Sequence, residues 1–217
     1  MNTMITENDI LNLRQQIKGR MSEKRSRHTL AVEEMAVRLG KIYAPDELTT
    51  LRVAALLHDV TKELSLEEQL DMCKLYNVPI GECDVYAPKT LHAITAAACI
   101  PDKFSRFDDE KVINAVRWHT TGKKGMSIVD KLIYLADYID DTRTFEDCVK
   151  LREFFFDFDF DNTTMEEKLA HLRDTLIMSF DMTVYALYFD GALIANDTID
   201  ARNELICEKL KANEKKG

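Results

Sequence analysis

The stretch LLHDVTK, residues 56–62, sets the main constraint on this chain, because it places a histidine and an aspartate directly after the apolar run of residues 53–57. That run ends a predicted helix, opened by Pro45, which is apolar nearly all round towards its end and should be buried. A buried histidine or aspartate without partners is costly in free energy. His58 and Asp59 therefore need hydrogen bonds, a salt bridge or a metal ion.

The composition favours an all-α protein. Only seven of the 217 residues are Gly and four are Pro, while 46% are hydrophobic and 31% are charged. This leaves little turn chemistry for a protein of many strands and suits long helices. The length suits one well-filled core. We therefore expect a single domain over residues 1–217, with a metal-site core over about 18–145 and a C-terminal helical part over about 146–217.

The charge and the cysteines limit the classes of function. A net charge of −9 argues against binding to nucleic acid polymers or anionic membranes. The five cysteines are scattered and have no C-x-x-C spacing, which argues against a disulfide framework or a zinc knuckle. Neither a signal-peptide pattern nor an apolar run of membrane-spanning length is present in the sequence. We expect a cytoplasmic protein.

Capping boxes predict several helix starts, because a hydroxyl and an acid three residues apart can satisfy free backbone N–H groups. The predicted pairs are Thr6/Asp9, Ser65/Glu68, Ser127/Asp130 and Thr163/Glu166. Other helix and loop boundaries are predicted from single residues or from composition. We expect a helix from His28 to a C-cap at Gly40, a loop over 78–90, a helix from His92 stopped by Pro101, caps at Asp108 and Asp197, and a helix end running into a loop over 154–161.

Four of the five histidines have comparable positions, since His28, His58, His92 and His119 each lie at an end of a predicted apolar helix. Any one of them alone would more often be a hydrogen-bonded core or capping residue. Four together with Asp59 favour a metal site, because imidazole and carboxylate are natural ligands of Fe, Mn, Zn or Co. The fifth, in the middle of a C-terminal helix, is His171, which we expect to be structural.

A further carboxylate is expected from the helix that begins after Ser127. Asp130, Asp137 and Asp141 lie on one face of this helix, and Asp137 is the deepest acid in its apolar run. We therefore predict Asp137 as a ligand. Asp130 is explained by the favourable dipole at the helix N-terminus. Asp140 and Asp141 are expected to be solvated, with a functional role as the alternative.

Cationic and hydroxyl side chains lie close to these candidate ligands in the sequence. On an acidic protein such groups suggest an anionic substrate, although each alone is more often an ordinary solvated charge. Arg25 and Lys62 stand out because each lies three residues from a candidate ligand. The other members of this set are Thr61, Thr120, Thr121, Lys123, Lys124, Lys131 and Arg143.

The ordered pattern H…HD…H…H…D, formed by the four histidines, Asp59 and Asp137, resembles that of the HD-domain metal-dependent phosphohydrolases. More narrowly, the sequence is similar to the HD-type symmetrical bis(5'-nucleosyl)-tetraphosphatases, the bacterial YqeK family. The matching stretches are KRSRHTLAV, LLHDVTKEL, LHAITAA, AVRWHTTGKKGMSIVDKLIYLADYIDDTR and DTIDARN, from about residue 20 to 205. The chain departs from that family in IDDTR where IEPNR is usual, in AND where HPD is common before TIDARN, and in Arg27 where an acid is frequent.

The resemblance implies an HD-type helical bundle with additional C-terminal helices and two divalent metal ions, expected to be Fe, with Mn or Co as alternatives. One ion would be held by His28, His58, Asp59 and Asp137, and the other by Asp59, His92 and His119, with Asp59 as the bridging catalytic ligand. Lys62 would be catalytic and would bind phosphate together with Arg143. The remaining substrate contacts implied are Arg25, His28, Thr120, Thr121, Thr198 and Arg202.

The substrate implied by the resemblance is diadenosine tetraphosphate, cut symmetrically to two ADP. One alternative is another HD-type nucleotide phosphohydrolase, acting on nucleoside mono- or triphosphates, which would share the same ligands. Another is a non-catalytic nucleotide-binding regulator. A homodimer is a possible assembly, and the C-terminal helices suit either a cap over the site or a dimer contact.

Overall fold

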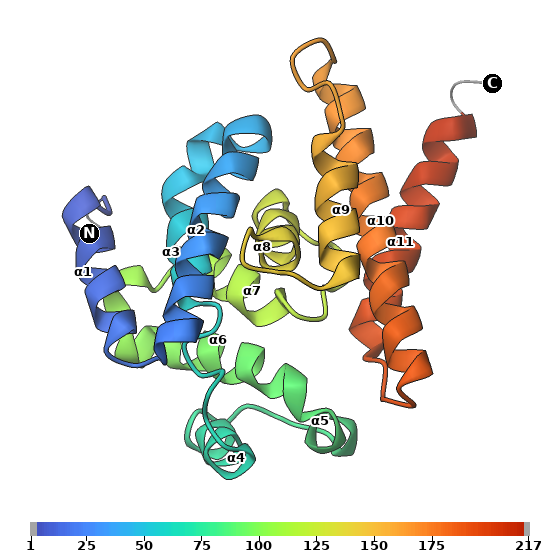
Figure 1. The fold of residues 1–217 in the computed structure, drawn as a ribbon. Coiled ribbons are helices and arrows are strands. Elements are labelled where there is room, and N and C mark those ends of the chain that lie inside the picture. Colours follow the sequence, from blue (N-terminus) through green and yellow to red (C-terminus); the bar gives the residue numbers. More distant parts are fainter. Residues whose placement is uncertain (1–3, 215–217) are drawn as a thin grey trace.

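All regular structure in the computed structural model is helical over residues 4–214, which are the residues described apart from the side chains of residues 82 and 83 (Figure 1). The prediction of an all-α protein is confirmed. The α-helices are α1 (Glu7–Lys18), α2 (Glu23–Tyr43), α3 (Leu48–Leu57), α4 (Leu66–Leu75), α5 (Glu82–Tyr86), α6 (Leu91–Lys103), α7 (Glu110–Trp118), α8 (Ile128–Ile139), α9 (Glu146–Phe156), α10 (Met165–Phe189) and α11 (Asn196–Glu214). Three short 3₁₀ helices are η1 (Pro45–Glu47), η2 (Pro88–Thr90) and η3 (Ser105–Phe107). Within the described residues, no helix is both long and apolar enough to cross a membrane.

The central helices of the bundle are α3 and α8. In Figure 1, α8 is seen end-on, between α2 and α9. All five residues at 53–57 in α3 are fully buried, and so are Leu132, Ile133 and Leu135 in α8. The apolar run before His58 is therefore part of the core, as predicted. Any polar group at the end of α3 is held inside the protein.

The C-terminal helices α9, α10 and α11 lie along one side of this core (Figure 1). Phe180 of α10 is fully buried and stacks on Tyr134 of α8, with ring centroids 4.6 Å apart. One cluster of buried apolar side chains includes residues from α1 to α11. The division into a metal-site core and a C-terminal part, and the homodimer, stay predictions.

A second, small cluster holds α4 against α6 below the bundle in Figure 1. It consists of Cys73, Leu91 and Ile94, with Leu70, Val78 and Ile80 packed around them. This part of the chain is therefore attached mainly through the first half of α6.

Three of the four predicted capping boxes are confirmed, at Thr6/Asp9, Ser65/Glu68 and Ser127/Asp130. For α10 the box lies one residue later, at Thr164/Glu167, and α7 is capped by Asp109 instead of Asp108. In both cases two identical residues are adjacent in the sequence. The capping pattern therefore fits a helix start at either position. The helix end and loop expected over 154–161 are confirmed, since α9 ends at Phe156.

The limits predicted for α2 were wrong at both ends. The helix begins at Glu23, because the Ser22 side chain accepts a hydrogen bond from the backbone N–H of Arg25. It also continues past Gly40 to Tyr43. A Cβ at Gly40 would lie 2.5 Å from Cδ1 of Leu51, so this glycine allows α2 and α3 to approach closely and is not a cap.

Two further predictions were wrong in the region around α6. Residues 78–90 are not simply a loop, because they contain α5 and η2. Pro101 does not stop α6, which runs to Lys103. A proline near the end of a helix removes only one of the last backbone hydrogen bonds, so the final turn still forms.

Candidate metal centre

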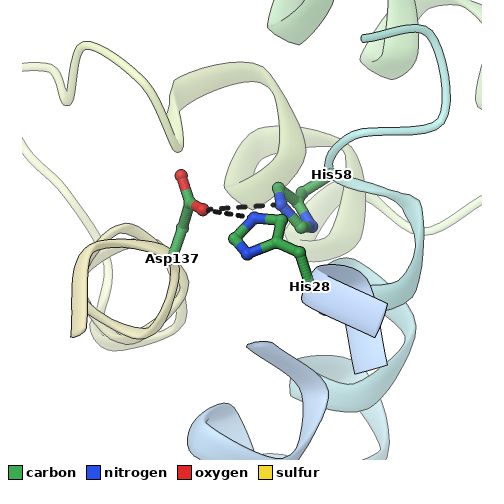
Figure 2. A group of neighbouring side chains, drawn as sticks. All are labelled: His28, His58 and Asp137. Atoms are coloured by element: carbon green, nitrogen blue, oxygen red, sulfur yellow. Dashed lines mark ion pairs between the residues drawn. The ribbon is translucent and has the colours of Figure 1, made fainter. Parts of the chain in front are cut away.

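The side chains of the four predicted histidines meet in the interior of the bundle. The side chains of Asp59 and Asp137 lie among them. His58 and Asp59 follow directly on α3, His92 is the second residue of α6, and His119 follows α7. Figure 2 shows how His28 from α2 and Asp137 from α8 point at the same place as His58. His28 lies within α2 and not at its end, so that part of the prediction was wrong, although the residue still joins the cluster.

One half of the cluster lies around Asp137. Its Oδ1 is 3.0 Å from Nε2 of His28 and 3.7 Å from Nε2 of His58, as the dashed lines in Figure 2 show. Nε2 of His58 is also 3.4 Å from Oδ2 of Asp59. His58 is fully buried and Asp59 is 3% exposed, so water has little access to these atoms.

The other half lies around the second oxygen of Asp59. Its Oδ1 is 3.2 Å from Nε2 of His92 and 3.7 Å from Nε2 of His119. The two Nε2 atoms of His92 and His119 are only 3.0 Å apart. Asp59 therefore directs one oxygen at each half of the cluster.

The backbone fixes the direction in which the imidazole nitrogens face. Nδ1 of His58 lies 2.6 Å from the carbonyl oxygen of Ala55, and Nδ1 of His119 lies 2.7 Å from that of Val116. A carbonyl oxygen can only accept, so both Nδ1 atoms carry hydrogen and Nε2 points into the cluster. Metal-ligating histidines use this arrangement, in which the nitrogen turned away from the metal donates to a fixed acceptor.

The buried Nε2 atoms of His28 and His58 face carboxylate oxygens at 3.0 Å (Asp137) and 3.4 Å (Asp59), but they form no hydrogen bond of good geometry among the residues that the structure describes. Buried polar atoms are nearly always partnered, and such an exception needs an explanation. A cation between the imidazoles and carboxylates would satisfy these atoms. In each of two groups of three side chains, the three ligand atoms, one from each residue, lie within 4.8 Å of one another. The groups are His28/His58/Asp137 and His58/Asp59/His119. The residues present therefore fit divalent metal ions.

The prediction that Asp140 is solvated was wrong, because this residue is fully buried. Its Oδ2 lies 3.2 Å from Nδ1 of His28, and its Oδ1 accepts hydrogen bonds from the backbone N–H and the hydroxyl of Thr142. The chain turns into an extended conformation at Asp140, directly after α8 ends, and this returns the side chain to α2. Asp140 lies three residues after the predicted ligand Asp137, and this spacing was the sequence signal for its place in the cluster. Asp141 is exposed, as predicted.

The pKa values near Asp137 show how strongly this half of the cluster attracts positive charge. Burial would lower the pKa of His58, but the carboxylates of Asp59 and Asp137 outweigh it and raise the pKa to about 10. The pKa of His28 is also raised, against burial, by Asp137 and Asp140. Burial would raise the pKa of both Asp59 and Asp137, but His58 and Arg143 respectively hold them well below the usual range. A metal ion has to displace protons from this half.

The other half differs, because burial dominates there. Burial lowers the pKa of His92 to about 4 and also lowers that of His119. Both imidazoles are therefore neutral at pH 7. Neutral imidazole is the form that binds metal.

Three cationic side chains border the cluster, as predicted. Nη1 of Arg25 lies 2.5 Å from Oδ2 of Asp59, and Nη2 of Arg143 lies 2.6 Å from Oδ1 of Asp137. Nζ of Lys62 lies 3.1 Å from Nε2 of His92. The arginines are thus at the Asp137 half and the lysine is at the His92 half.

The predicted threonines differ in their position. The hydroxyl of Thr120 is 3.2 Å from Nε2 of His119 and joins the cluster. The hydroxyl of Thr121 is buried and donates to the carbonyl oxygen of Gly122, while Thr198 donates to that of Thr121 at 2.9 Å. These bonds hold the loop that follows His119.

Two further residues lie outside the cluster. Arg202 bonds Asp181 of α10, and no bond among the described residues joins it or Thr198 to the histidines. The role of Thr121, Thr198 and Arg202 in binding substrate stays a prediction. His171 bonds the carbonyl oxygen of Phe155 at 3.0 Å and stacks on Phe158, as a structural histidine would.

Comparison with known proteins agrees with this geometry. Residues 25–142, more than half of the chain, match the HD domain, so this is an HD-domain protein. The chain is 30% identical to the symmetrical bis(5'-nucleosyl)-tetraphosphatase of Halalkalibacterium halodurans, over 90% of this chain and 96% of that one. It is also 30% identical to the protein of that name from Staphylococcus aureus, over 86% and 89% of the two chains. The chain therefore belongs to the family of symmetrical bis(5'-nucleosyl)-tetraphosphatases, which confirms the resemblance.

A solved structure shows the same fold. It is that of a "predicted HD superfamily hydrolase involved in NAD metabolism" from Clostridium acetobutylicum, with a TM-score of 0.79 and 32% identity. The alignment covers 94% of this chain and 99% of that chain. The likeness thus includes the helices that follow the HD domain.

Proposed function

We propose that this protein hydrolyses diadenosine tetraphosphate symmetrically to two ADP, using two divalent metal ions. Relatives with the corresponding name match it over nearly their whole length. The single observation that carries the proposal is the position of Asp59, whose two oxygens face two different pairs of imidazoles. A carboxylate in that position is suited to bridge two cations.

In this proposal, His28, His58, Asp59 and Asp137 hold one ion, and Asp59, His92 and His119 hold the other. The Nε2 atoms of His28 and His58, which face carboxylates without forming a hydrogen bond of good geometry, support the first set. The neutral state of His92 and His119 supports the second. We take iron as the native metal, with Mn or Co as substitutes, because nitrogen and oxygen ligands of this kind accept all three.

When bound, such ions supply a water of lowered pKa as nucleophile and positive charge for a phosphate oxygen. The chain's own cations do the remaining work. Lys62, held beside His92, donates to a phosphate oxygen on that side of the cluster. Arg143 and Arg25 hold Asp137 and Asp59 in place and direct their remaining N–H groups at phosphate oxygens on the other side. Thr120 supplies a hydroxyl next to His119.

Product analysis tests this function. The purified protein is incubated with diadenosine tetraphosphate and Fe(II), Mn(II) or Co(II) in turn, and the products are separated by chromatography. ADP as the sole product is the expected result. ATP plus AMP would overturn the symmetrical cleavage. Absence of turnover in a protein that still binds metal would overturn the substrate and favour another phosphate ester or a regulatory binding role.

A further inference from the structure

A cavity of about 240 Å³ adjoins the His92 half of the metal centre. It lies between the turn that follows Asp59, the start of α4, and the junction of η2 with α6. Lys62 and His92 are shared between this cavity and the metal centre. A ligand in the cavity can therefore contact residues at the edge of the cluster.

The charge of the cavity is opposite to that of the whole chain. Its lining includes Lys62 and Lys89, while no carboxylate is among the lining residues that the structure describes. The chain carries 38 acids against 29 lysines and arginines, so an acid-free cavity with two lysines is a local exception. Lys89 is exposed, and no ion pair joins it to a side chain that the structure describes. Its ammonium group is available to an anion.

The remaining walls are apolar and firmly attached. The apolar lining residues are Leu64, Leu66 and Pro88. Gln69 is a polar lining residue, and its amide donates to the carbonyl oxygen of Thr61 at 2.7 Å. Its own oxygen accepts from the hydroxyl of Thr95 on α6 at 2.5 Å. These bonds join α4 to α6 and to the turn that carries Lys62.

The volume decides how much of a ligand fits. Complete drug-sized ligands occupy pockets of about 300–1,000 Å³, so this cavity takes only part of a dinucleoside tetraphosphate. A symmetrical substrate has two equal halves, whereas the cluster has arginines on one side and a lysine on the other. The two halves must therefore bind in different surroundings.

We infer that this cavity is the subsite for one nucleoside diphosphate half of the substrate, with Lys62 on the inner phosphate, Lys89 on the outer phosphate, and the nucleoside against Leu64, Leu66 and Pro88. The inference rests on the proposed function for its substrate. Lys89 thereby determines affinity and not the rate of the chemical step.

The test uses two charge reversals, Lys89→Glu in the subsite and Lys41→Glu as a matched control. Lys41 is also exposed, lies on α2 about 20 Å from His28 along the helix, and changes the net charge equally. With diadenosine tetraphosphate, the KM of Lys89→Glu should rise about tenfold, as expected for one lost charge-assisted hydrogen bond, while kcat stays within about twofold. An equal KM for both variants and the unaltered protein would overturn the inference.

A second readout does not depend on turnover. ADP is titrated into the Mn²⁺-loaded protein by calorimetry, and Lys89→Glu should bind it more weakly than Lys41→Glu does. Leu66→Ser should weaken binding of ADP and leave binding of inorganic diphosphate unchanged, because diphosphate has no nucleoside. Equal ADP affinity in all three variants would overturn the subsite. If the unaltered protein fails to cleave diadenosine tetraphosphate, the proposed function fails, and the ADP titration still decides whether the cavity binds a nucleoside diphosphate.

Discussion

Two groups of buried charges share helix α2 and differ in how they are balanced. Glu33 is 1% exposed, and its carboxylate accepts hydrogen bonds from Arg14 at 2.7 and 2.9 Å and from Arg52 at 2.8 Å. Both of its oxygens are satisfied by side chains of the protein itself. Five residues earlier, roughly 140° around the helix, His28 enters the metal centre.

In the metal centre the carboxylates of Asp59 and Asp137 also meet arginines, Arg25 and Arg143. The buried Nε2 atoms of His28 and His58 nevertheless form no hydrogen bond of good geometry within the described part of the chain. A buried carboxylate whose bonds to arginines are complete, as at Glu33, therefore indicates structure, whereas buried imidazoles and carboxylates that converge without well-formed hydrogen bonds indicate a ligand from outside. The following predictions test this distinction.

The largest effect is expected for Asp59→Ala, because it removes the one carboxylate that both halves of the centre share. Bound metal should be lost, and activity should fall by about a thousandfold or more, since metal catalysis contributes several kcal/mol. Metal analysis and initial rates check this, with Asp141→Ala as the exposed control. An active, metal-free Asp59→Ala protein would contradict the assignment.

Lys62→Ala separates a substrate contact from a metal ligand. The lysine lies beside His92 but cannot coordinate the metal as an ammonium, so metal content should be unchanged. The rate should fall about 10²- to 10³-fold, as it does when one donor to developing charge is removed. Metal analysis and kcat measure the two effects separately. A variant that loses its metals would show that Lys62 holds the centre together.

Glu33→Ala should disrupt the ion pairs of Glu33 with Arg14 and Arg52 without affecting the metal centre. It leaves Arg14 and Arg52 without their shared carboxylate, at an expected cost of about 3 kcal/mol in the free energy of unfolding. This is the lower end of the range for a broken buried pair, because Arg14 is 34% and Arg52 19% exposed. Denaturant unfolding measures the change, and metal content should equal that of the unaltered protein. If Glu33→Ala loses metal, the two groups are coupled through α2.

Asp140→Ala tests whether a buried acid outside the ligand set orients His28. Loss of such a partner typically costs about 10- to 100-fold in metal affinity. Asp140→Asn keeps an acceptor for Nδ1 of His28 and should lose less. Competition with a chelator gives both affinities. Wild-type affinity in Asp140→Ala would rule out this orienting role.

The smallest effect is the release of protons when metal binds. In the metal-free protein, the pKa of His58 is raised to about 10 and that of His28 is also raised. A raised pKa means that the protonated ring stabilises the folded protein. This contribution is complete below the ordinary value of 6.5 and is lost as the pH rises through the folded value. Metal needs the neutral ring, so binding near pH 7 should release protons and strengthen as the pH rises.

Calorimetric titration with metal in two buffers of different ionisation enthalpy counts these protons. Glu33→Gln should release the same number as the unaltered protein, because Glu33 lies outside the centre. Metal binding without proton release would mean that His28 and His58 are already neutral.

Local signals allowed much of this structure to be predicted. The capping box at Ser127/Asp130 and the His-Asp pair after α3 involve residues close together in sequence, and both predictions agree with the structure. Asp140 was missed because its burial depends on where α8 ends. The partners of Glu33 were also out of reach, since Arg14 and Arg52 each lie 19 residues away on other helices. Such contacts depend on the packing of helices, which no short stretch specifies.

The hydrogen bond from Thr198 to the loop after His119 limits how far this protein can be truncated from its C-terminus. The match to the HD domain ends at residue 142, yet Phe180 and Ala201 lie so close to Gly122 that a Cβ there would be 2.6 Å from the Phe180 ring. The loop that positions His119 is thus built partly from residues about 60 to 80 positions later in the chain. Residue 142 is therefore where the sequence similarity ends and not where an independently folding unit ends. A fragment stopping at residue 142 would retain every proposed metal ligand, but the loop that positions His119 would lose its contacts with α10 and α11.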